Sequence, residues 1–215
     1  MPRLLTIVIC LLLTASLAPG QQQQTEAEQV TAAAQQAIGA MYGGRAYEFA
    51  QRIDAASREN YLERLNDEAR MLIKKVSEMP ETAEMAKILQ AHQELLIKPD
   101  LAHVKIDGDQ ASLPLNFDYD QLAPWMVMAK ASNEYVQIAA LSVKNDLPRQ
   151  SPQLVIRRYS AESHPYRKLA KQRAEVMREK GITPVPAVIH MVREDGQWKL
   201  DAEKFQEDMK QQAGR

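Results

Sequence analysis

The sequence has a single cysteine, Cys10, and only eight glycines in 215 residues. One cysteine excludes a cysteine-based zinc finger, and the scarcity of glycine leaves no glycine-rich loop that could cradle a nucleotide phosphate. No sign of charge predominates, because 27 Lys and Arg stand against 28 Asp and Glu, and this balance gives no reason to expect a nucleic-acid partner. Hydrophobic residues make up 45% of the chain, which is too apolar for a disordered protein. The length allows one sizeable domain or two small ones that share a core.

Residues 1–20 have the pattern of a secretory signal peptide. An apolar run from Leu4 to Leu13 follows a basic start, and small residues precede a predicted cleavage site between Gly20 and Gln21. The run is shorter than the ~20 residues that span a bilayer, which disfavours the alternative of an uncleaved membrane anchor. Cys10 lies within the run, so the mature chain would have no disulfide, as fits a periplasmic or secreted bacterial protein. The predicted organisation is a signal peptide at 1–20, a flexible tether at 21–25 and a single domain at 26–211.

Apolar residues before position 98 recur with helical spacing in three stretches. The first, from Val30 to Met41, ends at Gly43-Gly44. The second extends from 49 to 76, with Ser57 as an N-cap that could restart it. The third, from 85 to 96, stops before a proline. The sequence therefore predicts a helical N-terminal half.

The apolar pattern then changes to the alternation typical of strands. Residues 104–117 form a predicted hairpin around Asp107-Gly108, and Pro114 suggests an edge strand or a bulge in its second arm. A second hairpin is predicted at 188–200, and residues 153–159 also fit a strand. Residues 120–145 fit either a helix or a buried strand.

Two further helices are predicted in the C-terminal third. One is basic, begins at Pro165 with His164 as a cap, and ends at Gly181. Asp201 would cap the other, which is short. Helices followed by hairpins predict an α+β fold, in which N-terminal amphipathic helices pack on an antiparallel sheet.

Two short segments carry a family resemblance. The last hairpin has the sequence Val-Arg-Glu-Asp-Gly-Gln-Trp-Lys-Leu-Asp at 192–201, and Tyr47-Glu48-Phe49-Ala50 opens a predicted helix. They resemble the terminal hairpin and the start of the second helix in the nuclear-transport-factor-2-like superfamily, which includes exported bacterial members. The resemblance implies a long helix packed across a curved antiparallel sheet, as in a cystatin-like cone. Such a fold does not by itself fix a function.

Candidate ligand-binding residues come from one apolar run and one histidine. Trp125, Met126 and Met128 could form an adaptable ligand wall, although core packing also explains them. His190 alternates with apolar neighbours and so points to the other face of its strand, where it could line a pocket. None of the four histidines forms a zinc-binding pair, and no motif indicates a metal, a cofactor or a catalytic nucleophile.

Positive charge is concentrated between Arg157 and Lys180, where eight basic residues stand against three acidic ones. This segment could form a patch for an anionic partner, such as lipid headgroups or an acidic protein. The alternative is a solvated helix face, balanced by acidic residues of the second helical stretch (Glu59, Glu63, Asp67 and Glu68). The candidate patch consists of Arg157, Arg158, Arg167, Lys168, Lys171 and Arg173.

The leading hypothesis is an exported, non-enzymatic protein that binds a small apolar ligand or a protein partner. One alternative is a small hydrolase or isomerase with its site in the cone, for which Asp118, Tyr119 and Asp120 are the one tight acid–phenol cluster. Another is an adaptor whose basic helix makes peripheral contact with the cell envelope. A homodimer would be one way to neutralise the basic patch.

Overall fold

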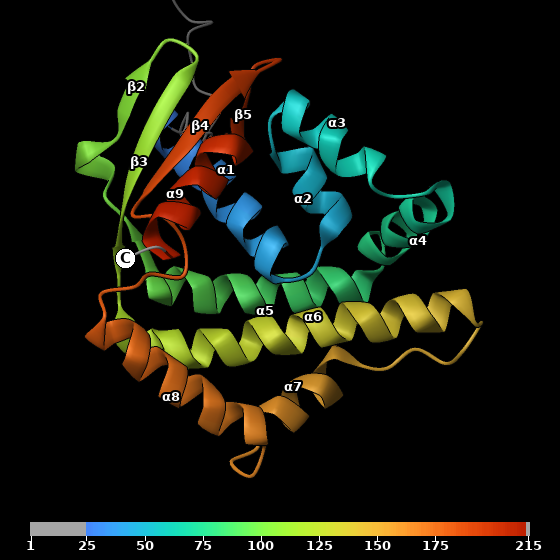
Figure 1. Ribbon diagram of the computed structural model, residues 1–215. Helices are drawn as coiled ribbons and strands as arrows, with labels where there is room; N and C mark the ends of the chain where they lie inside the picture. The colour runs from blue at the N-terminus through green and yellow to red at the C-terminus, as the bar shows by residue number, and fades with distance from the viewer. Residues whose placement is uncertain (1–24, 214–215) are drawn as a thin grey trace, which may run out of the picture.

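A curved antiparallel sheet and a layer of long helices make up the computed structural model, which describes residues 25–213 (Figure 1). The predicted α+β class is confirmed. The predicted signal peptide, and the predicted tether apart from Thr25, lie outside the described residues. The helices are α1 (Glu26–Tyr42), α2 (Ala46–Arg52), α3 (Ala55–Glu63), α4 (Asp67–Ser77), α5 (Pro80–Leu96), α6 (Leu122–Lys144), α7 (Pro152–Ser160), α8 (Pro165–Glu179) and α9 (Ala202–Ala213), with short 3-10 turns η1 (Leu101–His103) and η2 (Tyr119–Gln121). The strands are β1 (Ile97–Pro99), β2 (Lys105–Asp107), β3 (Gln110–Phe117), β4 (Val188–Glu194) and β5 (Gln197–Leu200).

The sheet has the strand order β1-β3-β4-β5, and β2 also pairs with β3. Alternation along β3 and β4 buries one face of the sheet, which includes Leu113, Ile189 and Met191. Helix α1 packs against this buried face, while α9 lies on the opposite side over β4 (Figure 1). The sheet is therefore enclosed by helices on its apolar side and partly open on the other.

Both predicted hairpins are confirmed. Gly108 has a φ of 57° in the turn between β2 and β3, and Asp195 and Gly196 have positive φ values in the turn between β4 and β5. The expectation that Pro114 marks an edge strand is wrong, because β3 has neighbours on both sides, but the pairing on one side is interrupted at Pro114. Pro114 is tolerated there because it lies between the residues that pair with β1 and those that pair with β2.

Helix α6 settles the ambiguous segment 120–145 as helical. It lies alongside α5, with α7 and α8 on its other side (Figure 1). Its buried residues include Trp125 and Tyr135, which join the sheet residues in one continuous apolar core.

The helical stretch expected from 49 to 76, which Ser57 could restart, consists of three helices, α2, α3 and α4. Ile53 has extended backbone and pairs with Leu200, which interrupts the first of them. Asp54, not Ser57, is the N-cap of α3, and Asn66 caps α4. The apolar spacing continues nearly unchanged across these breaks, so it does not mark where each helix ends.

The strand expected at 153–159 is also wrong, because these residues belong to α7. Ser151 caps this helix and Pro152 occupies its first turn. Its buried residues Pro152, Val155 and Tyr159 follow helical spacing. Val155 and Ile156 have a high β propensity, which favoured a strand when the sequence was considered alone.

The other helix predictions are confirmed. Gly43 is the C-cap of α1, and the imidazole of His164 caps α8 by accepting a hydrogen bond from the Tyr166 N–H at 3.2 Å. Asp201 accepts a hydrogen bond from the Lys204 N–H in the first turn of α9, as its predicted capping role requires. Within residues 25–213, no helix combines the length and apolarity needed to cross a bilayer.

Candidate functional site

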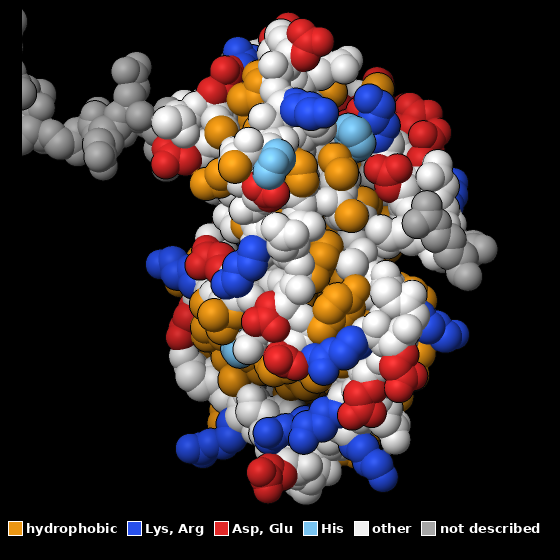
Figure 2. Space-filling model, turned by 90° about the vertical axis from the view of Figure 1, so that its left-hand side faces the viewer, with side chains coloured by type: hydrophobic (Ala, Val, Ile, Leu, Met, Phe, Trp, Pro, Cys, Tyr) orange, Lys and Arg blue, Asp and Glu red, His pale blue; other side chains and the backbone are white. Residues whose placement is uncertain are grey.

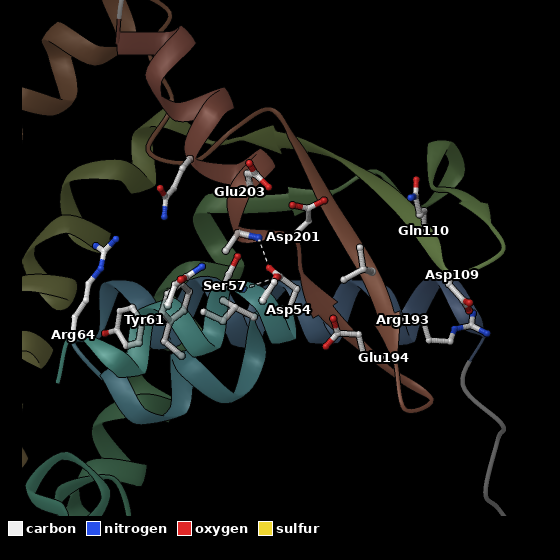
Figure 3. A pocket seen from close by; sticks show the side chains of 17 residues that line it. Asp54, Ser57, Tyr61, Arg64, Asp109, Gln110, Arg193, Glu194, Asp201 and Glu203 are labelled. Carbon is white, nitrogen blue, oxygen red and sulfur yellow. Dashed lines mark hydrogen bonds between the residues drawn. The ribbon is translucent and has the colours of Figure 1, made fainter. Parts of the chain in front are cut away.

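A wide hollow lies between α3, β4 and the start of α9 and has a volume of about 850 Å³ (Figure 3). Acidic side chains outnumber basic ones around it. Its charged lining residues are Asp54, Arg64, Asp109, Arg193, Glu194, Asp201 and Glu203.

Three of these carboxylates bind helix N-termini: Asp54, Glu194 and Asp201, the last as the cap of α9. Asp54 accepts hydrogen bonds from the Ser57 N–H at 2.8 Å and the Ala202 N–H at 3.0 Å, and thereby joins the start of α3 to that of α9 (Figure 3). Glu194 accepts from the Ala55 N–H with both oxygens. Partial burial opposes ionisation of Asp54, but these hydrogen bonds outweigh it and hold the pKa of its carboxyl below the usual value. This hollow is a structural junction, and none of the predicted site residues lines it.

His190 lies on the partly open face of the sheet, as its alternation with Ile189 and Met191 predicted. Together with Lys105, Ser112 and Lys204, it lines a shallow pocket of about 240 Å³. Its Nε2 is 3.8 Å from a carboxylate oxygen of Asp208 on α9. His190 is half-buried, and most of the residues that line the pocket are polar or charged, so they do not form the apolar wall that would tune a catalytic base.

A different cavity brings together residues from two of the predicted sets. Helices α5 to α8 enclose an apolar groove of about 300 Å³, hereafter the α5–α8 groove. Met128, from the predicted ligand wall, lines it, and so do Arg167 and Lys171 from the predicted basic patch. The remaining lining residues are Ile88, His92, Ala123, Pro124, Val127, Ile156 and Ser160.

The groove combines an apolar floor with positive charge at its edge. Val127 and Met128 are buried beneath it, whereas Lys171 is exposed. In the lower half of Figure 2, at the level of α5, α6 and α8, hydrophobic side chains reach the surface among charged ones, many of them Lys and Arg. No described residue that lines the groove is acidic. Burial lowers the pKa of His92, which therefore presents a neutral imidazole to the groove at neutral pH.

The two cations of the groove differ in their existing contacts. Arg167 Nη1 donates a hydrogen bond to the Ser160 carbonyl at 2.7 Å, which connects α8 to the end of α7. Lys171 has no hydrogen bond or ion pair with any described residue. Its ammonium group is thus free to bind an anion.

Comparison with family models, with curated proteins and with solved structures finds no match. The resemblance to the nuclear-transport-factor-2-like superfamily accordingly stays a prediction.

The rest of the basic patch is spread around α7 and α8. Arg158 pairs with Glu134 at 3.0 Å, whereas Arg157, Lys168 and Arg173 have no such partner among the described residues. The proposed internal balance is not observed, since of the four acidic residues named for it only Glu68 forms an ion pair, with Lys144 of α6. Most of this positive charge is therefore available to a partner.

The remaining residues that the sequence suggested for a site form contacts of the core or of the surface. Trp125 is buried with its ring edge against Tyr42, 4.8 Å between ring centres, and Met126 is half-buried beside the core. Asp118 accepts from the Asp120 N–H at 3.0 Å, and Asp120 pairs with Arg178, so the acid–phenol cluster forms local surface contacts. Across residues 25–213, no group of His, Cys, Asp and Glu side chains could hold a metal ion.

Proposed function

We propose that this protein is an exported binding protein for a small amphiphilic anion. The alkyl or acyl chain of the ligand occupies the α5–α8 groove, and its headgroup contacts Lys171 and Arg167. The observation that carries the proposal is the unpartnered Lys171 at the edge of an apolar groove that no described acidic residue lines. The signal-peptide pattern of residues 1–20 supports a role outside the cytoplasm.

The physical chemistry of the groove favours this ligand class over a purely apolar one. Burying a methylene group contributes ~0.8 kcal/mol, so a short chain supplies affinity through the apolar floor. The volume of about 300 Å³ is at the small end of ligand pockets and fits a single chain. A carboxylate or phosphate headgroup would be charge-paired at the edge, where a neutral headgroup leaves Lys171 unpaired.

The test is isothermal titration calorimetry with decanoate and, as an uncharged match, decanol, both below their aggregation limits. Decanoate should bind with one-to-one stoichiometry and more tightly than decanol. Lys171→Gln should weaken decanoate binding about three- to tenfold, because it removes one partly solvated ion pair, and should leave decanol binding unchanged. Ala123→Phe, which places a ring in the groove, should weaken the binding of both.

Lys168→Gln is the matched control, since Lys168 lies on the same helix, carries the same charge and does not line the groove. Equal affinity for decanoate and decanol would contradict the role of the headgroup. Loss of decanoate binding in Lys168→Gln as large as in Lys171→Gln would indicate a diffuse surface effect. Salt-sensitive binding to phosphatidylglycerol vesicles in place of decanoate would favour the envelope-adaptor hypothesis.

A further inference from the structure

A second cavity lies on the other side of α5, and its lining is rich in positively charged side chains. It measures about 230 Å³ and lies between α1, α2 and the first half of α5. Three cationic side chains line it, Arg45, Arg52 and Lys87, and Glu48 is the one acidic side chain among its described lining residues. We call this the Arg45 cavity.

The side chain of Arg45 is buried in the wall of this cavity. It is 8% exposed, and its guanidinium pairs with Glu48 through Nη1 only. Its Nε is buried without a hydrogen-bond partner among the described residues. Nε packs against Gly43 and is closed off from solvent, so a ligand in the cavity would contact the outer guanidinium nitrogen, Nη2. Nη2 also has no hydrogen-bond partner among the described residues and can donate to an acceptor.

Two glycines of α1 and its C-cap leave the space that this guanidinium occupies. A Cβ on Gly39 would lie 3.4 Å from Arg45 Nη2, and one on Gly43 would lie 3.2 Å from Arg45 Nε. The chain therefore places backbone without side chains directly against the arginine. This close approach fixes the guanidinium in the wall of the cavity.

The other two cations have no counter-ion. Neither Arg52 nor Lys87 forms an ion pair with a described residue, and Arg52 Nε is also buried without a partner. The first turn of α5 contributes Thr82 and Ala83 to the wall, but Glu81 in the same turn opposes the positive end of the helix dipole, so the positive potential comes from the side chains. With Glu48 paired to Arg45, the charge left unbalanced is positive.

We infer that the Arg45 cavity binds a phosphate group, either as the free ion or as a small phosphomonoester. A phosphate offers three or more acceptor oxygens and two negative charges, so it can contact Arg45, Arg52 and Lys87 together, whereas a carboxylate offers two oxygens and one charge. The cavity volume of about 230 Å³ exceeds the ~30 Å³ that one water occupies and leaves room for the ion. This site is separate from the α5–α8 groove and does not depend on its ligand.

The experiment is a titration of the purified chain with inorganic phosphate at constant ionic strength, followed by calorimetry and by ³¹P line broadening. Phosphate should bind one-to-one and raise the melting temperature, while acetate at equal ionic strength should not. Arg52→Gln and Lys87→Gln should each weaken phosphate binding about tenfold, because each removes one charge-assisted contact from a partly exposed position without disturbing buried Arg45. Phenyl phosphate in place of phosphate distinguishes a monoester ligand, which should bind at least as tightly, from the free ion.

Lys130→Gln is the control, because it removes one exposed, unpaired charge of α6 outside the cavity. Circular dichroism confirms that each variant is folded. The inference is overturned if wild type does not bind phosphate, if acetate binds as tightly, or if Lys130→Gln weakens binding as much as Lys87→Gln.

Discussion

Asp54 connects the start of α3 to the start of α9 by a hydrogen bond to Ala202, 148 positions further along the chain. One oxygen accepts from Ser57 and the other from Ala202, so the carboxylate caps α3 and also satisfies one N–H at the start of α9, which Asp201 caps. Removing a single N-cap side chain costs ~0.5–2 kcal/mol. We therefore expect Asp54→Ala to lower the free energy of unfolding by about 1–2 kcal/mol at pH 7, measured by urea denaturation.

The same substitution should change how stability depends on pH. The folded-state pKa of Asp54 lies below its unfolded value, so its contribution is complete above about pH 4 and is lost as the pH falls through the folded-state pKa. The stability difference between wild type and Asp54→Ala should shrink accordingly in acid. Asp109→Asn is the control, since Asp109 lines the same hollow and its carboxylate has no partner among the described residues. A difference that stays constant down to pH 2 would contradict this role.

At the scale of residues, the sequence predicts a side chain's contacts with the next few residues better than its contacts with distant parts of the chain. The capping roles of His164 and Asp201 could be predicted because each depends on the next few residues. Half of the role of Asp54 could not, because Ala202 approaches only when the chain has folded. The unpaired state of Arg45 likewise depends on the packing of α1 against α2 and α5.

At the scale of elements, α7 packs on α6 through its buried residues and forms polar contacts with one carboxylate of α6, that of Glu134. It accepts hydrogen bonds from Arg158 and from the hydroxyl of Tyr159, which is buried. Burial and the nearby Glu134 raise the pKa of Tyr159 to about 12, so its phenol stays protonated and remains a donor. Because a buried donor left unpaired costs ~1–3 kcal/mol, Glu134→Ala should destabilise α7 locally.

Hydrogen exchange measures this effect. Amide protection across 152–160 should fall about tenfold or more in Glu134→Ala, whereas protection in α1 should stay unchanged. Gln137→Ala, one turn later on α6, is the control because Gln137 is exposed and bonds only to Asn133 of the same helix. Uniform loss of protection through the chain would mean that α7 does not open as a separate unit.

The elements that sequence reasoning identified correctly are those with unambiguous ends. Turn residues with positive φ, Gly108 and Gly196, mark the two hairpins. The errors arose where a break was short or a propensity was overridden. The extended backbone of Ile53 is stabilised by pairing with Leu200, which no local pattern shows, whereas Ser151-Pro152 was an available start signal for α7.

At the scale of the whole molecule, the sequence supplied the components of the α5–α8 groove but not their assembly. Met128 was a candidate as part of an apolar run and Lys171 as part of a basic helix, and nothing in the sequence placed them in one cavity. Ile88 and His92, from α5, were missed as lining residues because their spacing indicated only a helix. Which faces of four helices meet is decided by packing, and helical periodicity alone does not specify it.

The two tryptophans test whether the sheet and the helical layer unfold as one unit. Trp125 is in α6 and Trp198 in β5, and both belong to the same continuous core, so unfolding should be cooperative.

In Trp125→Phe, fluorescence reports only the sheet, and in Trp198→Phe it reports only the helical layer. Circular dichroism at 222 nm reports mainly the helices of either variant. Each variant loses some packing, so its fluorescence midpoint in urea is compared with its own dichroism midpoint. We expect the two midpoints to coincide in both variants, because α1 packs on both the sheet and α5, and α5 packs on α6. A fluorescence transition of Trp125→Phe that is displaced from its dichroism transition would show that the sheet unfolds separately, despite the shared core.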